Sequence, residues 1–267
     1  PMTPGREVAG VVDEAGDGVD PGWVGRSVVA DLGAASGGYA ELALARAESL
    51  HAVPQGVTAD QAVAMIGTGR TTLAILEVAA PAPDDVAVVT AAAGGIGTLL
   101  VQALCDIGAM VVGAAGGGEK AALVRRLGAT AAVDYSLQGW QDAVRAAVGD
   151  RSVTLALDGV GGEIGRAALE LLGGGGRLVM FGTAGGRPTE LSANDLYQRG
   201  ITASAAIGAP ILERPGGLRP LEEKALRSVA EGRLIPVVGQ ALPLADAPAA
   251  HAAVESRATT GKTVLHP

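Results

Sequence analysis

The second third of the chain alternates short apolar runs with longer amphipathic segments. Residues 86–90 carry no charge and are rich in valine, which is typical of a strand buried on both faces of a parallel sheet. From Leu99 to Ile107 apolar residues recur at helical spacing, and Gly108 is placed to end that helix. Five more strands are predicted in this rhythm, over residues 110–114, 131–134, 153–158, 177–181 and 201–206. The pattern predicts an α/β fold with a doubly wound, six-stranded parallel sheet.

The two ends of the chain lack this rhythm. Near the start, strands are predicted over residues 8–12, 27–30, 39–45 and 50–53. Thr58 and Gln61 form a capping box at the start of a helix. Near the end, helices over 218–231 and 245–256 and a strand over 262–265 are expected to return to this β region. The predicted organisation is a β domain over residues 1–66, a sheet domain over 67–207 and a C-terminal segment over 208–267.

A glycine-rich turn joins the first central strand to its helix. Residues 92–97 read Ala-Ala-Gly-Gly-Ile-Gly and fit the dinucleotide-binding template G-x-G-x-x-G, with alanine at the first position. Gly94 would let the backbone approach a diphosphate, and Gly97 would let the helix pack closely on the strand. Helix-start amides and the helix dipole suit such an anion. The chain holds 41 glycines, so a turn that binds nothing is the alternative, but the next strand also fits a Rossmann site.

The end of that next strand favours NADPH over NADH. An NAD site usually places an acidic residue there, about 20 residues past the glycines, to hold the ribose hydroxyls. Here Ala114, Ala115 and Gly116 are small and uncharged, and Lys120 follows. The absence of a carboxylate removes repulsion toward a 2′-phosphate, and the lysine supplies the opposite charge. The alternative is that Lys120 is an ordinary solvated residue, although the helix dipole favours an acid in a first turn.

Glycine-rich loops also follow the fourth and fifth predicted strands. Gly159 and Val160 lie in the first loop, and Phe181 and Gly182 lie where the second begins. Both loops belong to the carboxyl edge of the sheet, where small residues would let a flat nicotinamide and its ribose lie against backbone. Simple turn chemistry explains some of these glycines equally well. Asp158 is the one inviting carboxylate at this edge, and its expected role is a structural cap for the loop after it.

Composition and charge narrow the range of partners. The 267 residues are 48% hydrophobic but only 2% aromatic, so small aliphatic side chains must build the core. A net charge of −8 disfavours a nucleic acid or an anionic membrane as the main partner. No signal peptide and no apolar span of about 20 residues is visible, which favours the cytoplasm. His51, His251 and His266 show no ligand spacing and are interpreted as surface or packing residues.

Several segments together carry a family resemblance. They are PGREVAGVV at residues 4–12, GGYAE at 37–41, the turn at 91–97, DGVGG at 158–162 and GKTVL at 261–265. With them the chain resembles the zinc-free quinone oxidoreductases, a zeta-crystallin-like group of the medium-chain dehydrogenases/reductases. The resemblance implies a GroES-like β domain, and it implies that Lys120 and Tyr135 hold the adenosine 2′-phosphate of NADPH. A packing role at a strand end is the alternative for Tyr135. The candidate cofactor-binding residues are Ala93, Gly94, Gly95, Ile96, Gly97, Gly116, Lys120, Tyr135, Gly159, Val160, Phe181 and Gly182.

The chain departs from its relatives in two ways. Zinc-dependent relatives carry Gly-His-Glu where this chain has Gly5-Arg6-Glu7, and they carry a run of cysteines where it has only Cys105. Neither zinc site can be assembled from these residues, so no metal is predicted. Members of the family also have additional strands before the segment that begins at Pro4. We therefore expect an N-terminally incomplete GroES-like domain with an exposed sheet edge.

The expected activity is transfer of hydride from NADPH to a quinone or an α,β-unsaturated carbonyl, because such acceptors need no Lewis acid. No residue is nominated as catalytic, since no Ser-His-Asp, Cys-His or paired-carboxylate pattern is evident. The alternatives are enoyl reduction of an acyl thioester and a non-catalytic NADPH-binding protein. Because members of the family commonly pair through the last strand of this sheet, a homodimer through residues 201–206 is also expected.

Overall fold

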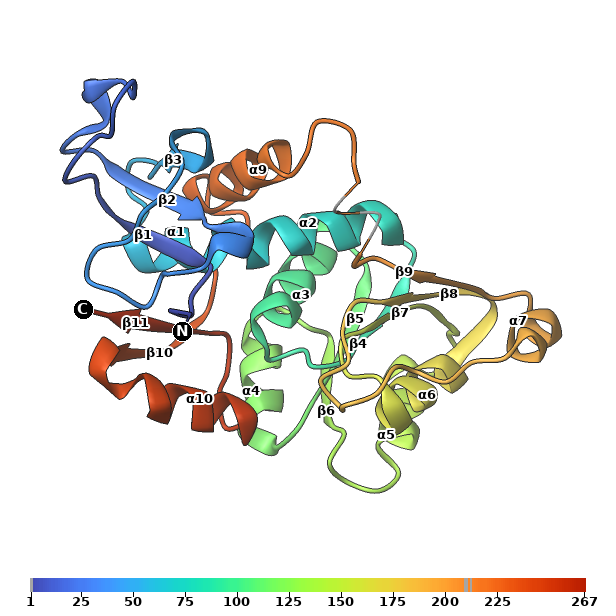
Figure 1. Cartoon of the computed structure of the whole chain (residues 1–267). Helices are drawn as coiled ribbons and strands as arrows, with labels where there is room; N and C mark the ends of the chain where they lie inside the picture. Colours follow the sequence, from blue (N-terminus) through green and yellow to red (C-terminus); the bar gives the residue numbers. More distant parts are fainter. Residues whose placement is uncertain (1, 209–210, 212) are drawn as a thin grey trace. The chain divides into compact units, whose positions relative to one another are not determined.

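The computed structural model describes residues 2–208, 211 and 213–267 (Figure 1). The chain divides into two compact units. The first unit combines Pro1–Arg70 with Leu218–Pro267, and the second is the continuous stretch Thr71–Gly217. Helix α2 (Thr68–Ala79) runs across the first boundary.

The second unit is built on a six-stranded sheet in the order β6-β5-β4-β7-β8-β9, with every neighbouring pair parallel. Its strands are β4 (Val86–Val89), β5 (Met110–Ala115), β6 (Ala131–Asp134), β7 (Val153–Asp158), β8 (Leu172–Met180) and β9 (Thr202–Ala205). The order reverses between β5 and β7, on either side of β4, which is the switch point of a doubly wound sheet. The predicted fold class is therefore confirmed.

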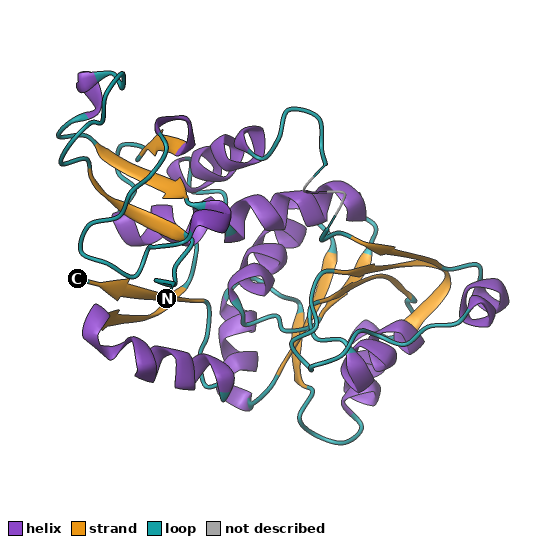
Figure 2. Cartoon of the chain, viewed as in Figure 1, coloured by secondary structure: helices purple, strands orange, loops and turns teal. Residues whose placement is uncertain are grey.

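Helices cover both faces of this sheet (Figure 2). Along β4, Ala87 and Val89 belong to one hydrophobic cluster and Val86 and Val88 to the other, because successive side chains of a strand point to opposite faces. The first cluster includes residues of α2, α3 (Gly95–Ile107) and α4 (Gly118–Arg126). The second includes residues of α5 (Trp140–Val148) and α6 (Gly162–Leu171), and α7 (Ala193–Arg199) lies in the connection from β8 to β9. Two such layers explain why the strands read as continuous apolar runs.

The first unit contains two small sheets. Strands β1 (Glu7–Val11), β2 (Ser27–Asp31) and β3 (Leu50–Ala52) are antiparallel in that order, and β10 (Val238–Pro243) pairs in parallel with β11 (Lys262–His266). Its α-helices are α1 (Ala59–Ile66), α9 (Arg219–Ala230) and α10 (Ala247–Glu255). Its short 3₁₀ helices are η1 (Pro21–Trp23), η2 (Gly33–Ala35), η3 (Ala47–Ser49) and η4 (Leu244–Asp246). Thr58 and Gln61 form the predicted capping box before α1.

Two predicted elements differ from the structure. The strand predicted over residues 39–45 is wrong, because that segment forms bends and irregular backbone. Leu42 and Leu44 there are 76% and 94% exposed, so their side chains find no apolar layer, and the segment has no partner strand among the described residues. The strand predicted over residues 177–181 starts earlier, because β8 begins at Leu172, directly after α6. Four glycines inside β8 hide its start, since glycine usually weakens a strand.

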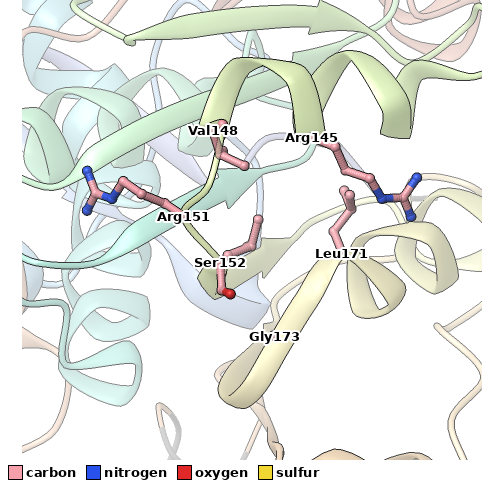
Figure 3. A pocket seen from close by; sticks show the side chains of 8 residues that line it. Arg145, Val148, Arg151, Ser152, Leu171 and Gly173 are labelled. Carbon is pink, nitrogen blue, oxygen red and sulfur yellow. The ribbon is translucent and has the colours of Figure 1, made fainter.

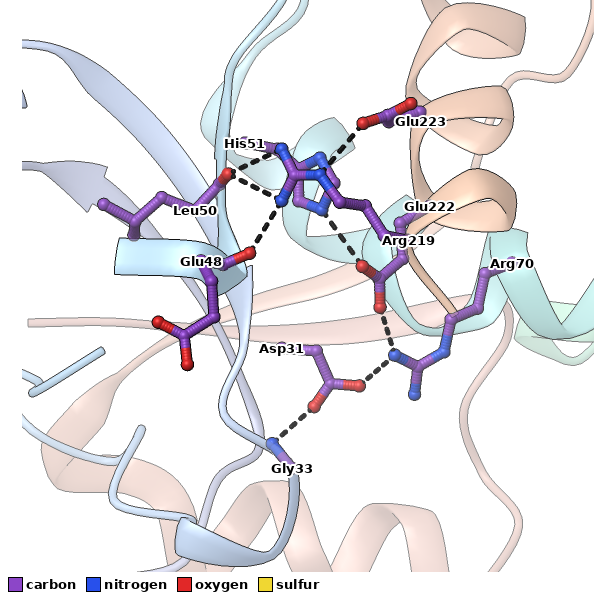
Figure 4. Close-up of polar contacts among 9 residues, drawn as sticks. All are labelled: Asp31, Gly33, Glu48, Leu50, His51, Arg70, Arg219, Glu222 and Glu223. Atoms are coloured by element: carbon purple, nitrogen blue, oxygen red, sulfur yellow. Dashed lines mark hydrogen bonds and ion pairs between the residues drawn. The ribbon is translucent and has the colours of Figure 1, made fainter. Parts of the chain in front are cut away.

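A polar network joins distant segments of the first unit (Figure 4). Arg70 forms ion pairs with Asp31 of β2 and with Glu222 of α9, where its guanidinium lies 2.6 Å from Oε1. The Nε2 atom of His51, on β3, lies 3.0 Å from Oε2 of the same Glu222. Burial opposes ionisation of Glu222, but His51 and Arg70 outweigh it and hold the Glu222 pKa below its ordinary value. The network therefore ties the C-terminal segment to the N-terminal sheet of this unit.

No single helix in the described part of the chain is both long and apolar enough to cross a membrane. The bent pair formed by α1 and α2 passes that test by length and composition when the two helices are taken together.

Candidate cofactor-binding site

The carboxyl ends of five strands carry the loops that hold most of the predicted site. Thr90, just after β4, donates its backbone NH to the carbonyl of Leu157 on β7 at 3.0 Å. On the other side of β4, Ala92 donates to Ala114 of β5 at 3.1 Å. Tyr135 follows β6 and donates to Ala115 of β5 at 3.0 Å. Backbone hydrogen bonds between neighbouring strand ends thus gather these loops at one edge of the sheet.

The turn between β4 and α3 has room for backbone only. A Cβ at Gly97 would overlap the carbonyl oxygen of Ala91 and would come within 2.7 Å of the Ala92 Cα. Ala91 itself is held at φ 48, a left-handed conformation that a residue with a side chain rarely adopts. A Cβ at Gly94 would meet only the Ala91 oxygen, at 3.3 Å, so Gly94 is not required by internal packing in the same way. Gly97 thus lets the first turn of α3 approach the backbone of the preceding turn, while its predicted contact with the strand stays a prediction.

Helix α3 begins without a side-chain cap. Gly94 is its N-cap residue and accepts a backbone hydrogen bond from Thr98, and the Gly94 position provides no side-chain cap for the NH groups of the first turn. The NH groups of Gly95, Ile96 and Gly97 belong to the first turn, whose donors have no partner inside the helix. Ala93 is only 3% exposed, so its side chain belongs to the core and only its backbone is able to contribute. This geometry fits a diphosphate bound by backbone NH groups.

Tyr135 and Lys120 lie on segments that flank Gly116. A Cβ at Gly116 would come within 3.2 Å of the Tyr135 ring, so the glycine leaves space for that ring. Lys120 is the third residue of α4. The NH of Gly117 donates to Asp134 Oδ1 at 2.8 Å, and the hydroxyl of Ser136 donates to the same oxygen at 2.6 Å. These two hydrogen bonds lower the Asp134 pKa, so this carboxylate stays ionised and fixes the turn before α4.

The loops after β7 and β8 pack directly on one another. A Cβ at Gly159 would lie 2.5 Å from the ring of Phe181, and one at Gly182 would lie 2.7 Å from the Gly159 carbonyl oxygen. Both glycines are therefore required for this packing. Val160 is 3% exposed, and its carbonyl accepts from the NH of Gly185 at 2.6 Å. The structure brings together Gly159, Phe181 and Gly182, while it turns the Val160 side chain into the interior.

Sequence reasoning missed Thr90 and Thr189, both of which contact Asp158. The Thr90 hydroxyl donates to Asp158 Oδ1 at 2.7 Å, and the Thr189 hydroxyl donates to Oδ2 at 2.6 Å. The NH of Val160 donates to Oδ1 at 3.0 Å, so the predicted capping of this loop by Asp158 is confirmed. A threonine ending a β-strand carries no signal of such a role, and Thr189 lies 31 residues from its partner in sequence.

Comparison with known proteins places this arrangement in a family. Residues 1–55 match the model described as "Alcohol dehydrogenase GroES-like domain", and residues 95–218 match the model described as "Zinc-binding dehydrogenase". The chain is 33% identical over 269 residues to "Quinone oxidoreductase-like protein 2" of Bos taurus, covering 99% of this chain and 76% of that protein. The chain belongs to the quinone oxidoreductase family.

Two further comparisons add detail within that family. The chain is 30% identical to a "2-haloacrylate reductase" of Burkholderia sp over 274 residues, covering 100% of this chain and 81% of that protein. The solved structure of Escherichia coli quinone oxidoreductase complexed with NADPH matches with a TM-score of 0.87 and 28% identity. That match covers 99% of this chain and 82% of the E. coli chain. The zinc-free quinone oxidoreductase resemblance stated from the sequence is thereby confirmed.

A hollow of the second unit lies at the other edge of the six-stranded sheet. A cavity of about 290 Å³ is lined by residues at the start of β7 and β8, including Val153 and Gly173, and by Arg145, Arg151 and Ser152. Figure 3 shows the two arginine side chains pointing to opposite sides. Arg145 pairs with Asp142, and Arg151 donates to the carbonyl of Asp84. These cations do not converge, so the cavity lacks the form of an anion site.

Each of the three histidines has a different partner in the first unit. His51 is buried against Glu222, His251 contacts the Tyr39 hydroxyl at 3.2 Å, and His266 pairs with Asp60. Within the described ranges, no three His, Cys, Asp or Glu side chains are grouped so as to hold a metal ion. Cys105 is a partly buried thiol whose pKa is raised by burial. Its predicted role as an inert packing residue is consistent with that environment.

Proposed function

We propose that this chain is an NADPH-dependent oxidoreductase that reduces a quinone or an α,β-unsaturated carbonyl compound without a metal. The observation that carries the proposal is the β4–α3 turn, where Gly97 admits no side chain and α3 begins without a side-chain cap. Such a helix start binds a diphosphate through backbone NH groups. Membership of the quinone oxidoreductase family, and the NADPH in the E. coli structure, support the same cofactor.

We assign three roles along the carboxyl edge of the sheet. The backbone from Ala93 to Gly97 binds the diphosphate of NADPH. Lys120 pairs with the 2′-phosphate, and the Tyr135 ring beside Gly116 lies against the adenosine end. Gly159, Phe181 and Gly182 form the surface against which the nicotinamide and its ribose lie, with Val160 supplying backbone.

Bound NADPH supplies the hydride, and the chain's own residues orient it and exclude water from the reacting face. Arg6 stands where zinc-dependent relatives have histidine, so we propose an acceptor that is electrophilic without a Lewis acid. Quinones and α,β-unsaturated carbonyls meet that condition. The similarity to a 2-haloacrylate reductase supports this class, because a haloacrylate has an electron-poor double bond conjugated to a carboxyl group.

The test is a comparison of binding and turnover on the purified chain. Calorimetry with NADPH and NADH should show tighter binding of NADPH. Oxidation of NADPH, followed by its near-ultraviolet absorbance, should proceed with a benzoquinone, a simple enone or 2-chloroacrylate. Turnover with crotonyl thioester alone would identify an enoyl reductase instead. Tight NADPH binding without turnover on any acceptor would identify a non-catalytic binding protein, and no heat with either nucleotide would overturn the proposal.

We also propose that the first compact unit is the GroES-like domain and the second the dinucleotide-binding domain. Strand β9 pairs with β8 on one side and is the last strand of its sheet. An edge strand of this kind is able to pair with its own copy, so we propose a homodimer through β9. Light scattering on Ala203→Pro, which removes a backbone donor from β9, should show a monomer if this edge is the interface.

A further inference from the structure

Asp158 is a fully buried carboxylate at the carboxyl end of β7. Its Oδ1 accepts the Thr90 hydroxyl at 2.7 Å and the Val160 NH at 3.0 Å. Its Oδ2 accepts the Thr189 hydroxyl at 2.6 Å and the Gly161 NH at 3.1 Å. In the described part of the chain these neutral donors, rather than a cation, surround the charge. Burial of a carboxylate is tolerated when its oxygens accept this many hydrogen bonds.

The four donors come from three separate loops of the candidate site. Thr90 directly precedes the diphosphate turn, and its hydroxyl also accepts the Gly159 NH at 3.0 Å. Val160 and Gly161 belong to the loop after β7, and Thr189 belongs to the segment after β8. The Asp158 backbone carbonyl accepts the Phe181 NH at 2.8 Å as well. One residue therefore connects the diphosphate turn with both loops proposed for the nicotinamide.

A glycine on the neighbouring helix leaves space for the Asp158 carboxylate and the Thr189 hydroxyl. Gly165 lies on α6 directly beside it, and a Cβ there would overlap both the Thr189 hydroxyl and Asp158 Oδ2. Helix α6 is thus able to approach the carboxylate only because residue 165 is glycine. The position of the carboxylate is fixed from the helix side as well as by its hydrogen bonds.

We propose that Asp158 is a positioning residue that sets the nicotinamide end of the site relative to the diphosphate turn. The inference rests on the proposed function, and it assigns to Asp158 an effect on cofactor geometry beyond the capping of one loop. An asparagine at this position has one acceptor oxygen and one NH₂ group. If its oxygen replaces Oδ1, its NH₂ faces the Gly161 NH, and two donors then oppose one another. The loops should shift while the core around them stays filled.

The decisive experiment compares a whole cofactor with its adenosine half. Adenosine 2′,5′-bisphosphate contacts only the adenosine end, whereas NADPH also contacts the loops after β7 and β8. Asp158→Asn should weaken NADPH by about tenfold, because loops that have shifted no longer fit the nicotinamide end, and should lower kcat. Its affinity for the bisphosphate should stay within about twofold of the wild type. Thr189→Val removes one hydroxyl and keeps the shape of the side chain. It should also weaken NADPH more than the bisphosphate, but by a smaller factor than Asp158→Asn.

Asp85→Asn provides the matched control. Asp85 is also buried, at 4% exposed, but it lies before β4 at the opposite edge of the sheet. This variant should lose stability while keeping both affinities and the kcat of the wild type. Equal weakening of both ligands by Asp158→Asn, or no change in either NADPH affinity or kcat, would overturn the proposal.

A measurement without ligand separates this inference from the proposed function. Hydrogen exchange should be faster in Asp158→Asn than in the wild type, both at residues 159–162 and at residues 183–189, and unchanged there in Asp85→Asn. Thr189→Val serves the same purpose if Asp158→Asn does not fold. If wild-type protein bound no nicotinamide nucleotide, the proposed function would fail. Unchanged exchange in either loop would refute the positioning role whether or not nucleotide binds.

Discussion

The two edges of the six-stranded sheet each hold one buried aspartate, and the two are stabilised differently. At the amino edge Asp85 accepts the Thr154 hydroxyl at 2.6 Å, the Ala82 NH at 2.8 Å and the Arg177 guanidinium at 2.7 Å. At the carboxyl edge Asp158 accepts only hydroxyl and backbone donors among the described residues. Each aspartate links β4, β7 and β8, or the segments that adjoin them.

We infer from this difference that Asp85 acts on the stability of the second unit, whereas Asp158 acts on the path of the loops. At Asp85 one of the three donors is the charged Arg177 guanidinium of β8, so Coulomb attraction adds to the hydrogen bonds from Thr154 and Ala82. Backbone NH groups and hydroxyls bond along defined directions, so a carboxylate that accepts several of them fixes the path of the loops. Hydrogen bonds hold both carboxylates, but among the described residues only the one at the amino edge also has an ion pair. The following changes test that contrast.

Gly97→Ala should have the largest effect. The added Cβ would overlap the Ala91 oxygen, so we expect a loss of stability of about 1–3 kcal/mol and loss of NADPH binding. Thermal unfolding measures the stability, and calorimetry measures the binding of NADPH. Gly94→Ala should lose binding with little change in stability, because its Cβ would meet the Ala91 oxygen only at 3.3 Å. Gly174→Ala, at the amino edge, should change neither. Full NADPH affinity in Gly97→Ala would show that the diphosphate lies elsewhere.

Lys120→Ala should affect binding at the carboxyl edge without affecting stability. We expect NADPH to bind about tenfold to a hundredfold more weakly, since a hydrogen bond to a charged group is worth about 1.5–3 kcal/mol, and NADH to bind unchanged. Arg151→Ala, which removes a cation at the amino edge, is the control and should leave both affinities unchanged. An equal loss for the two nucleotides in Lys120→Ala would remove the assignment to the 2′-phosphate.

Asp85→Asn should alter the dependence of stability on pH. Burial opposes ionisation of Asp85, but hydrogen bonds from Thr154 and Ala82 and the charge of Arg177 lower its pKa in the folded chain below the ordinary 3.8. Its stabilising contribution is therefore complete above the unfolded pKa and is lost as pH falls through the folded pKa. We expect the variant to be less stable than the wild type by about 1–3 kcal/mol at neutral pH. Its free energy of unfolding should fall less steeply as the pH is lowered. Denaturant unfolding across pH measures this, and parallel curves for the two proteins would contradict it.

Ala91→Gly and Ala80→Gly should have the smallest effects. Both alanines are held at positive φ, 48 and 43, after and before β4. Glycine adopts this conformation without a steric penalty, so each change should alter stability by no more than about 1 kcal/mol. Only Ala91→Gly should weaken NADPH, by loosening the diphosphate turn. Equal effects of the two variants on binding would mean that the strained turn has no part in the site.

The sequence predicted the regular parts of the sheet and the glycine turn because their determinants are local. The bounds of β6 and β7 agree with those predicted, since each is an apolar run with clear breaks at its ends. The segment at residues 39–45 has the same local pattern but no partner strand in the described structure, and pairing is not encoded within a segment. The Thr90–Asp158–Thr189 contacts were missed for a similar reason, because they depend on how three distant loops meet. Local patterns thus locate the site, and tertiary contacts determine its shape.

The ion pairs of Arg70 have a consequence for how the chain folds during its synthesis on the ribosome. Arg70 joins Asp31 to Glu222, so the first unit is completed by a segment that is synthesised after the whole second unit. The second unit is continuous and is able to fold as soon as it has emerged, whereas the β1–β3 sheet must wait for helix α9. Until α9 has been synthesised, Asp31, His51 and Arg70 lack Glu222 and are exposed to water and to other nascent chains. Slow translation of the last segment should therefore lower the yield of native protein more than slow translation of the middle.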